Sequence, residues 1–228
     1  MTSRANTVFD LAQQPLRQVN AALQAADHGA FTIRNPGGAH ALACGLTAPV
    51  EVTVEGHAGY FAAGMNQHAA ITIRGNAGTG VAENMMSGLV RVTGNASQSA
   101  GATGRGGLLV VEGDTSARCG ISMKGIDIVV SGSVGHMAAF MGQAGRLVVL
   151  GDAGEGLGDS IYEARIYVRG RVAGLGADCV PKKLKDKHRK ELAALLTQAG
   201  IAADPAEFTR YGSARALYNF DIDNQDAY

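Results

Sequence analysis

Apolar and glycine positions recur along this chain with a period of 19 residues. Two apolar residues, separated by one other residue, stand before each repeat glycine. The pairs are Val52/Val54, Ile71/Ile73, Val90/Val92, Leu109/Val111, Ile128/Val130, Leu147/Val149 and Ile166/Val168, and the glycines are Gly56, Gly75, Gly94, Gly113, Gly132, Gly151 and Gly170. This alternation of β-prone positions before a turn residue predicts a short strand with one buried face in every repeat.

A fixed period of this length predicts stacked coils of a single chain. Left-handed acyltransferase-type β-helices repeat in hexapeptides, which do not fit a 19-residue period. Because parallel crossovers are normally right-handed, we expect an all-β, single-stranded, right-handed parallel β-helix of about seven to eight coils. Gly37 lies 19 residues before Gly56 and follows Ile33, which indicates a less regular first coil.

Two further columns hold only small residues. Three positions after the repeat glycines stand Gly59, Gly78, Ser97, Ser116, Gly135, Gly154 and Ala173. Seven positions after them stand Ala63, Ala82, Gly101, Gly120, Ala139, Gly158 and Ala177. Larger side chains would collide with the wall or with neighbouring coils where a backbone turns tightly, so both columns indicate a packing constraint.

Helical segments flank the repeats. Pro15 is placed to begin a helix that continues to about Ala26, and a second helix is expected after the basic run 182–190, with Gly200 as its stop. Residues 204–207 (DPAE) resemble a capping box of a short helix. We therefore predict an N-terminal helical cap at 1–30, a parallel β-helix at 31–180, and a C-terminal helical cap and tail at 181–228. Both caps are expected to cover open ends of the stack.

Composition narrows the range of partners. The formal net charge is zero and charged residues make up 18% of the chain, below the usual ~25%. Nucleic acid and anionic membranes favour a surplus of positive charge, so neither is expected to bind. No apolar run approaches the ~20 residues that span a bilayer, and no long apolar signal region is present. A cytoplasmic location is the simplest expectation.

The cysteines and histidines do not form a recognisable metal motif. Cys44, Cys119 and Cys179 are widely separated, which argues against disulfides, iron–sulfur clusters and zinc sites. The histidines are His28, His40, His57, His68, His136 and His188, and none forms an HxxxH or HExxH pair. His57 and His136 would meet only if their coil positions aligned. We predict no metal-binding residues in this chain.

Catalytic and nucleotide-binding motifs are also missing from the sequence. The segment 151–158 (GDAGEGLG) fails the GxGxxG spacing, and its glycines largely fall in the repeat columns. Ser99, Ser122 and Ser160 do not lie in a GxSxG elbow, and the acidic residues Asp114, Asp127, Asp152 and Asp159 do not cluster. We expect neither catalytic nor cofactor-binding residues, and we assign a structural role to the seven repeat glycines. The basic run 182–190 is interpreted as the solvated face of an amphipathic helix.

Methionines gather between the predicted strands. They are Met65, Met85, Met86, Met123, Met137 and Met141. Flexible thioether side chains on one exposed side would form a docking surface, whereas internal ones would only fill the core. The sequence leaves both alternatives open.

Several segments resemble a known module. They are GYFAAGMN (59–66), GVAENMMSG (80–88), ARCGISMKG (117–125), GDSIYEA (158–164), YGSAR (211–215) and YNF (218–220). Together with the repeat they resemble the C-terminal (GXGXG) β-helix domain of the glutamate synthase large subunit. The closest resemblance, over essentially the whole chain, is to the small β-helix component of N-methylglutamate synthase, also called methylamine–glutamate N-methyltransferase.

This resemblance implies a division of labour between subunits. A flavin-binding glutamate-synthase-like subunit, carrying FMN and an iron–sulfur cluster, and a glutamine-amidotransferase-like subunit would perform the chemistry. The present chain would be a non-catalytic scaffold in their hetero-oligomer, which joins methylamine to L-glutamate and releases ammonia. Two alternatives stay open: the equivalent β-helix component of a formyltransferase/hydrolase or formylmethanofuran dehydrogenase complex, and a stand-alone β-helix enzyme acting on polysaccharide. The sequence does not determine the exact reaction, the stoichiometry or the docking face.

Overall fold

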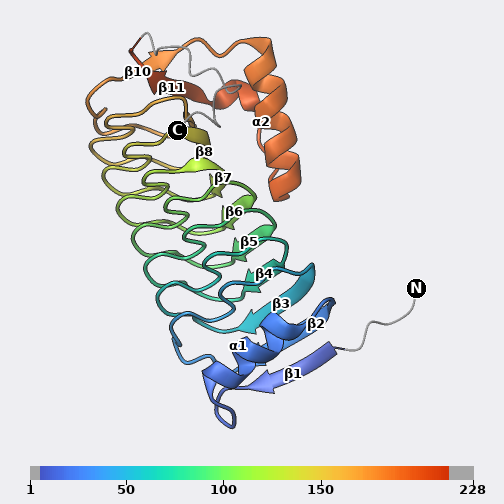
Figure 1. The fold of residues 1–228 in the computed structure, drawn as a ribbon. Coiled ribbons are helices and arrows are strands. Elements are labelled where there is room, and N and C mark those ends of the chain that lie inside the picture. Colours follow the sequence, from blue (N-terminus) through green and yellow to red (C-terminus); the bar gives the residue numbers. More distant parts are fainter. Residues whose placement is uncertain (1–5, 216–228) are drawn as a thin grey trace, which may run out of the picture.

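The computed structural model describes residues 6–215 and shows an elongated stack of coils with one sheet along its length (Figure 1). The 11 strands are β1 (Asn6–Asp10), β2 (Gly29–Arg34), β3 (Val50–Glu55), β4 (Ala70–Ile73), β5 (Leu89–Val92), β6 (Leu108–Val111), β7 (Lys124–Val130), β8 (Ala144–Val149), β9 (Arg165–Val168), β10 (Cys179–Lys182) and β11 (Thr209–Ser213). The helices are α1 (Leu16–Ala25), α2 (Asp186–Ala199) and the short 3-10 helix η1 (Pro205–Glu207).

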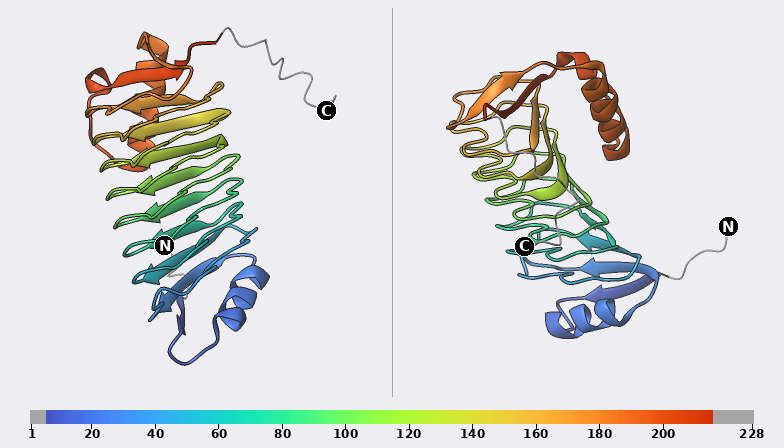
Figure 2. Two further views of the ribbon diagram at one scale, coloured as in Figure 1. Left: turned by 90° about the vertical axis from the view of Figure 1, so that its left-hand side faces the viewer. Right: turned by 45° about the horizontal axis from the view of Figure 1, so that its top comes forward.

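The parallel strands β3 to β9 follow the period read from the sequence. Ile73 pairs with Val54 on one side and with Val92 on the other, and this offset of one repeat continues to Val168. One irregularity lies between Lys124 and Asp127, where β7 bulges against β8. The predicted parallel β-helix with a 19-residue period is therefore confirmed (Figure 2).

The first coil departs from the extrapolated register. Ile33 pairs with Val54, and Arg34 pairs with Glu55. By this pairing Asn35, and not Gly37, occupies the place that corresponds to Gly56. The extrapolation to Gly37 was wrong because this coil contains two additional residues, although a less regular first coil does begin the stack.

The N-terminal end is closed by a β–α–β unit. β1 pairs in parallel with β2, and α1 connects them in place of the walls of a normal coil. Val19 and Leu23 of α1 are fully buried in the interior of the stack. The Asn20 amide donates to the Ala41 carbonyl at 2.8 Å and accepts from the Ala43 N–H at 2.9 Å. The helix thus caps the end, and its segment also adds a strand to the sheet.

The C-terminal end is closed by strands. β11 pairs antiparallel with β9, and β10 pairs antiparallel with β11 to form the edge. Pro181 lies in β10, where a missing N–H is tolerated at an edge. Of the predicted C-terminal cap and tail at 181–228, residues 216–228, which include the YNF motif, lie outside the described residues.

Helix α2 does not cap this end, in contrast to the expectation. It runs along the outer face of the sheet, beside strands β6 to β9 (Figures 1 and 2). Leu192, Leu195 and Leu196 pack there against a column of outward-facing residues, namely Val110, Val129, Val148 and Tyr167. The helix ends near β5, where Arg91 donates to the Ala199 carbonyl at 2.7 Å. The reason is that these four strands are apolar on both faces and need a cover.

The small-residue column seven positions after the glycines has a conformational cause. Six of its seven members adopt left-handed backbone with φ between 56° and 70°: Ala63, Ala82, Gly101, Gly120, Ala139 and Gly158. In this region bulky and β-branched residues are strained. The members are also buried, so conformation and space both require small side chains.

Residues on either side of this column are left-handed as well. They stand at positions five and nine after the first six repeat glycines, such as Phe61 and Met65 (φ 57° and 56°). Left-handed residues donate alternately to the coils before and after: Ala82 N–H bonds to the Ala62 carbonyl, and Asn84 N–H bonds to the Ala102 carbonyl, each at 2.9 Å. The alternation therefore ties each coil to both neighbours.

Candidate functional site

The repeat glycines lie beside a ladder of polar side chains. The residue after each of the first six repeat glycines carries a hydrogen-bond acceptor that receives the backbone N–H one coil further on. The donor–acceptor pairs are Asn76 N to His57 Nδ1, Asn95 N to Asn76 Oδ1, Asp114 N to Asn95 Oδ1, Ser133 N to Asp114 Oδ1, Asp152 N to Ser133 Oγ and Arg171 N to Asp152 Oδ1, at 2.7–3.0 Å.

Glycine makes room for this ladder. A Cβ built on Gly113 would overlap Asn95 Oδ1 and lie 2.8 Å from the Gly94 carbonyl oxygen. A Cβ on Gly132 would overlap Asp114 Oδ1 in the same way. The structural role assigned to the glycines therefore has a specific cause, because the acceptor of one coil occupies the space of a side chain in the next. The sequence signal for it is the polar column from His57 to Asp152, which the periodicity analysis overlooked.

The remaining predicted residues are dispersed. His57 belongs to the ladder, whereas His136 lies exposed on another column. His188 is a buried residue in the first turn of α2 and accepts from the Lys185 N–H at 3.1 Å, which helps to begin the helix. Burial, followed by the neighbouring Arg210 charge, lowers the pKa of His188. Among residues 6–215 His, Cys, Asp and Glu side chains do not gather into a group of three that would hold a metal ion.

The three cysteines are unpaired thiols. Burial raises the pKa of Cys119 to about 12 and that of Cys179 to about 11. Cys44 is partly buried and donates to the Phe61 carbonyl at 2.7 Å, and burial raises its pKa too. All three thiols are therefore held protonated near neutral pH.

Five of the six methionines divide into two groups, and Met137 is half-buried. Met85 and Met123 are fully buried, so these two fill the core. Met65, Met86 and Met141 are exposed, as expected for methionines on the surface. The two groups follow from position in the coil, since side chains next to a left-handed residue alternate between inside and outside.

Large apolar side chains concentrate at one corner of the first regular coil. Tyr60, Phe61 and Met65, which we call the aromatic corner, are 52%, 48% and 54% exposed. Tyr60 stacks on His40 with ring centroids 4.5 Å apart. The Phe61 ring lies over Gly80 of the next coil, because a Cβ there would approach its Cδ1 to 2.7 Å. These contacts hold the two rings in place on the surface.

The backbone at the aromatic corner is costly for these residue types. Phe61 and Met65 both have left-handed φ angles, a conformation that costs roughly 1–2 kcal/mol for a residue with a Cβ. Later coils place Gly80, Ser99, Arg118, Met137 and Gly156 at the position of Phe61, and Asn84, Thr103, Ser122, Met141 and Ser160 at that of Met65, so only this coil has an aromatic residue there. Bulky apolar residues at strained, exposed positions gain nothing from the core, so they point to a contact outside the chain.

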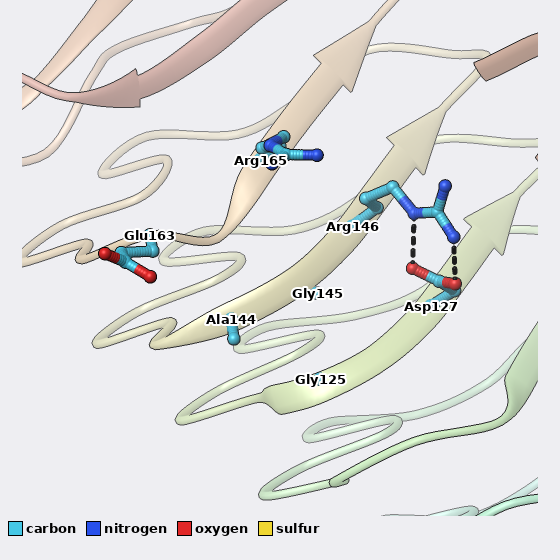
Figure 3. Close-up of a pocket in the computed structure, with 7 residues that line it drawn as sticks. All are labelled: Gly125, Asp127, Ala144, Gly145, Arg146, Glu163 and Arg165. Carbon is cyan, nitrogen blue, oxygen red and sulfur yellow. Dashed lines mark hydrogen bonds and ion pairs between the residues drawn. The ribbon is translucent and has the colours of Figure 1, made fainter. Parts of the chain in front are cut away.

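A shallow charged groove opens on the sheet face beside α2. It has a volume of about 470 Å³ and is lined by Gly125, Asp127, Ala144, Gly145, Arg146, Glu163 and Arg165 (Figure 3). Arg146 forms a two-pronged pair with Asp127, with Nε–Oδ1 and Nη2–Oδ2 distances of 2.7 and 2.5 Å. Arg165 pairs with Glu191 of α2 at 2.8 Å. Both arginines are thus already neutralised by carboxylates.

Electrostatics in this region favour a structural role. The hydrogen bonds that Arg146 donates to the Asp127 carboxylate raise the pKa of Arg146 against the effect of burial. Nearby Tyr167 is fully buried under α2, and within residues 6–215 its hydroxyl has no hydrogen-bond partner. Burial raises the pKa of this phenol. The Arg165–Glu191 pair attaches α2 to the sheet and the Arg146–Asp127 pair joins β8 to β7, so these arginines are held in structural pairs.

Membrane insertion has no candidate among the helices: none in the described part of the chain has the length and apolar character to cross a bilayer.

Comparison with known proteins identifies a close relative. The chain is similar to "Protein GlxC" of Rhizobium meliloti (strain 1021), with 58% identity over 226 residues. The alignment covers 97% of this chain and 99% of the relative. Neither a family model nor a solved structure matches the chain.

Proposed function

The chain belongs to the same family as Protein GlxC, which supports a glutamate-synthase-like relationship, and from this premise we propose that it is a scaffold subunit of a glutamate-synthase-like flavoenzyme complex. More specifically, we propose N-methylglutamate synthase, in which methylamine and L-glutamate give N-methyl-L-glutamate and ammonia. The flavin-binding and glutamine-amidotransferase-like subunits would carry FMN, an iron–sulfur cluster and the catalytic residues. This chain would position them.

The observation that carries the proposal is the aromatic corner. Phe61 and Met65 combine wide exposure with a left-handed backbone, and neither property stabilises the isolated chain. Burial by a partner would recover roughly 25 cal/mol for each Å² of apolar surface removed from water. We assign this corner to the flavin-binding glutamate-synthase-like subunit, the partner that the sequence resemblance implies.

The shape of the rod supports the same function. Ten consecutive strand pairings and the polar ladder connect every coil to its neighbours, so surface positions keep fixed distances from one another. Binding loses less entropy when the surface is already rigid. A rigid rod is therefore suited to hold two larger subunits at a fixed separation.

An omission experiment tests the proposal. The full chain is co-expressed with the flavin-binding and amidotransferase-like subunits of the same organism, and N-methylglutamate formation is measured by mass spectrometry. We expect a stable three-component complex whose flavin absorbance follows the flavin-binding subunit. Turnover or flavin bound by the isolated chain would contradict the scaffold role. Assembly with an amidohydrolase-like subunit instead would replace the proposed reaction with formyl transfer.

A further inference from the structure

Exposed apolar side chains gather on one side of the rod. Apart from Val8, every large apolar residue that is exposed in the described chain stands four to eleven positions after a repeat glycine. We call these stretches of the coils the turn wall. The exposed apolar residues on it are Tyr60, Phe61, Met65, Met86, Met141, Tyr162 and Leu175. Apolar surface available for a partner is therefore concentrated on this wall.

A second corner repeats the geometry of the aromatic corner four coils later. Met137 and Met141 stand at the positions of Phe61 and Met65 and have the same left-handed backbone, with φ 56° and 53°. Each donates its backbone N–H to the coil that follows, at 2.7–2.8 Å, as Phe61 and Met65 do. Met141 is 40% exposed, and Phe140 and Met137 beside it are half-buried. We call Met137, Phe140 and Met141 the methionine corner.

The coils between the two corners carry other residue types at these positions. They are Gly80, Asn84, Ser99, Thr103, Arg118 and Ser122. Left-handed backbone is unfavourable for a residue with a Cβ, and glycine and asparagine tolerate it best. The exposed Met141 side chain gains little from the core in return. Like the aromatic corner, the methionine corner therefore points to a contact outside the chain.

Basic side chains without ion pairs lie between the two corners. Arg105, Arg118 and Lys124 are on the turn wall and are exposed. Within residues 6–215 none of the three belongs to an ion pair. The coils that join the two corners thus present positive charge to whatever covers them.

Acidic side chains do not cancel this charge. Between the corners the turn wall has one acidic residue, Glu83. Its carboxylate lies beside Gly80, since a Cβ there would stand 2.8 Å from Glu83 Oε2. Glu155, Asp159 and Glu163 come after the methionine corner, in the next coil. Three basic residues therefore stand against one acidic residue in the stretch between the corners.

The two corners fit within the footprint of one partner. Neighbouring coils are ~4.8 Å apart, so four coils separate the corners by ~19 Å. A stable interface buries about 800 Å² on each side and uses about 20–30 residues, which corresponds to a patch about 30 Å across. The three residues of the aromatic corner are too few for such an interface. A partner that covers them with a standard footprint would also reach the methionine corner.

We propose that the methionine corner is a second anchor for the flavin-binding subunit, which presents acidic side chains to Arg105, Arg118 and Lys124 between the two anchors. The inference rests on the proposed function, because it extends the contact assigned to the aromatic corner. Buried apolar anchors supply most of the affinity of an interface, and complementary charges set orientation and association rate. Two anchors on a rigid rod would hold the subunit in one orientation.

Photo-crosslinking in the co-expressed complex locates the partner. A benzophenone side chain replaces Met141 in the full chain, and the irradiated complex is analysed by mass spectrometry. We expect a crosslink to the flavin-binding subunit. The same side chain in place of Arg74, which is exposed directly after β4 and outside the turn wall, is the control and should not reach that subunit. A crosslink from position 141 to the amidotransferase-like subunit, or to neither subunit, would overturn the inference.

Substitution of the methionine corner measures its share of the affinity. Met137→Asn with Met141→Asn introduces a residue type that tolerates left-handed backbone. We expect this full-length variant to bind the flavin-binding subunit at least tenfold more weakly than the unsubstituted chain, while its thermal unfolding stays unchanged. Met141→Asn alone is the milder variant and should weaken binding in the same direction. Unchanged affinity in a folded variant would overturn the second anchor.

Charge reversal tests the stretch between the corners. Arg118→Glu with Lys124→Glu should slow association with the flavin-binding subunit at least fivefold at low salt, and high salt should remove most of the difference. Arg17→Glu with Arg74→Glu reverses two exposed charges outside the turn wall and should leave the rate unchanged. Equal effects of the two double variants would contradict an acidic partner surface at this place.

The aromatic corner separates failure of this inference from failure of the proposed function. If Phe61→Asn with Met65→Asn prevents binding while the methionine variant binds normally, the second anchor is refuted and the proposed function stands. If the unsubstituted chain does not bind the flavin-binding subunit, both are refuted.

Discussion

Asn95 and Gly113 share one space in the stack. Asn95 Oδ1 accepts the Asp114 N–H at 2.9 Å and lies where a Cβ on Gly113 would stand. The acceptor of one coil thus requires a glycine in the next. This relationship, repeated from coil to coil, explains why the period of the glycines coincides with the period of the strands.

Gly113→Ala should destabilise the fold. The new methyl group displaces the Asn95 carboxamide and presses on the Gly94 carbonyl, at an expected cost of about 1–3 kcal/mol. Urea unfolding followed by circular dichroism measures the loss. Gly212→Ala is the control, because its Cβ would meet the nearest atom, Lys182 Cγ, at an ordinary 3.7 Å. Equal effects of the two substitutions would refute the account of the glycines.

The pair should also show coupling. Asn95→Ala leaves the Asp114 N–H without its acceptor and should cost about 1 kcal/mol. Because it also removes the atom that Gly113→Ala displaces, the double variant should be less destabilised than the sum of the single variants. A double-mutant cycle in urea checks this. Strict additivity would show that the amide and the glycine do not share a space.

The left-handed column predicts a size limit. Gly120 has φ 70°, and its Cβ would lie 3.2 Å from Met123 Sδ and 3.3 Å from Ile128 Cδ1. Gly120→Val should therefore cost about 2 kcal/mol or more from backbone strain and overpacking. Gly120→Ala should cost less, since Ala139 has the same conformation one coil later. Thermal unfolding of both variants tests this order of stability. A valine variant more stable than the alanine variant would contradict the size limit.

Removing the buried hydroxyl of Tyr167 should not destabilise the fold, in contrast to the glycine substitutions. Its hydroxyl finds no partner among residues 6–215, so Tyr167→Phe should leave the free energy of unfolding unchanged or raise it by up to about 1 kcal/mol. Leu195→Ala, in the same cluster under α2, should lower it by about 2–5 kcal/mol. Denaturant midpoints distinguish the two. A marked loss in the phenylalanine variant would mean that the hydroxyl is hydrogen-bonded.

The thiols predict an alkaline loss of stability. Folding raises the pKa of Cys119 to about 12 and that of Cys179 to about 11 from the ordinary value of 9.0. The unfolded chain therefore loses these protons first, and stability should be constant below pH 9 and fall as the pH rises toward the folded values. Unfolding measured between pH 7 and 10.5 tests this. A Cys119→Ala/Cys179→Ala variant should show a shallower decline.

The sequence predicted strands β3 to β9 well because each one repeats the same two apolar positions, whereas β1, β10 and β11 lie outside the repeat and were not predicted. Ile73 and Val92 had to face one interior, and their spacing determined the register. The polar ladder was missed although His57, Asn76 and Asn95 are visible as a column, because an acceptor column has meaning only once the backbone N–H groups beside it are known. Phe61 and Met65 lie on the surface because their backbone is left-handed. That conformation cannot be recognised from the sequence when the residue is not a glycine.

The course of α2 shows a second limit. The outward column changes from Thr53, Thr72 and Arg91 to Val110, Val129, Val148 and Tyr167, which marks the covered part of the sheet. This change is readable in the sequence, but it indicates a cover without saying which segment supplies it. The first coil contains two additional residues between Ile33 and Val54. They could not be recognised in the sequence because Gly37 lies one 19-residue period before Gly56.

Partner capture by the aromatic corner tests the central claim most directly. Phe61→Asn with Met65→Asn removes the apolar surface with a residue type that tolerates left-handed backbone, so the isolated rod should keep its stability. Ser99→Asn with Thr103→Asn is the control at corresponding positions of a later coil. In native mass spectrometry of the co-expressed subunits, we predict that the first variant loses the flavin-binding subunit while the control retains it. Full retention by the first variant would contradict the claim that this corner docks the catalytic partner.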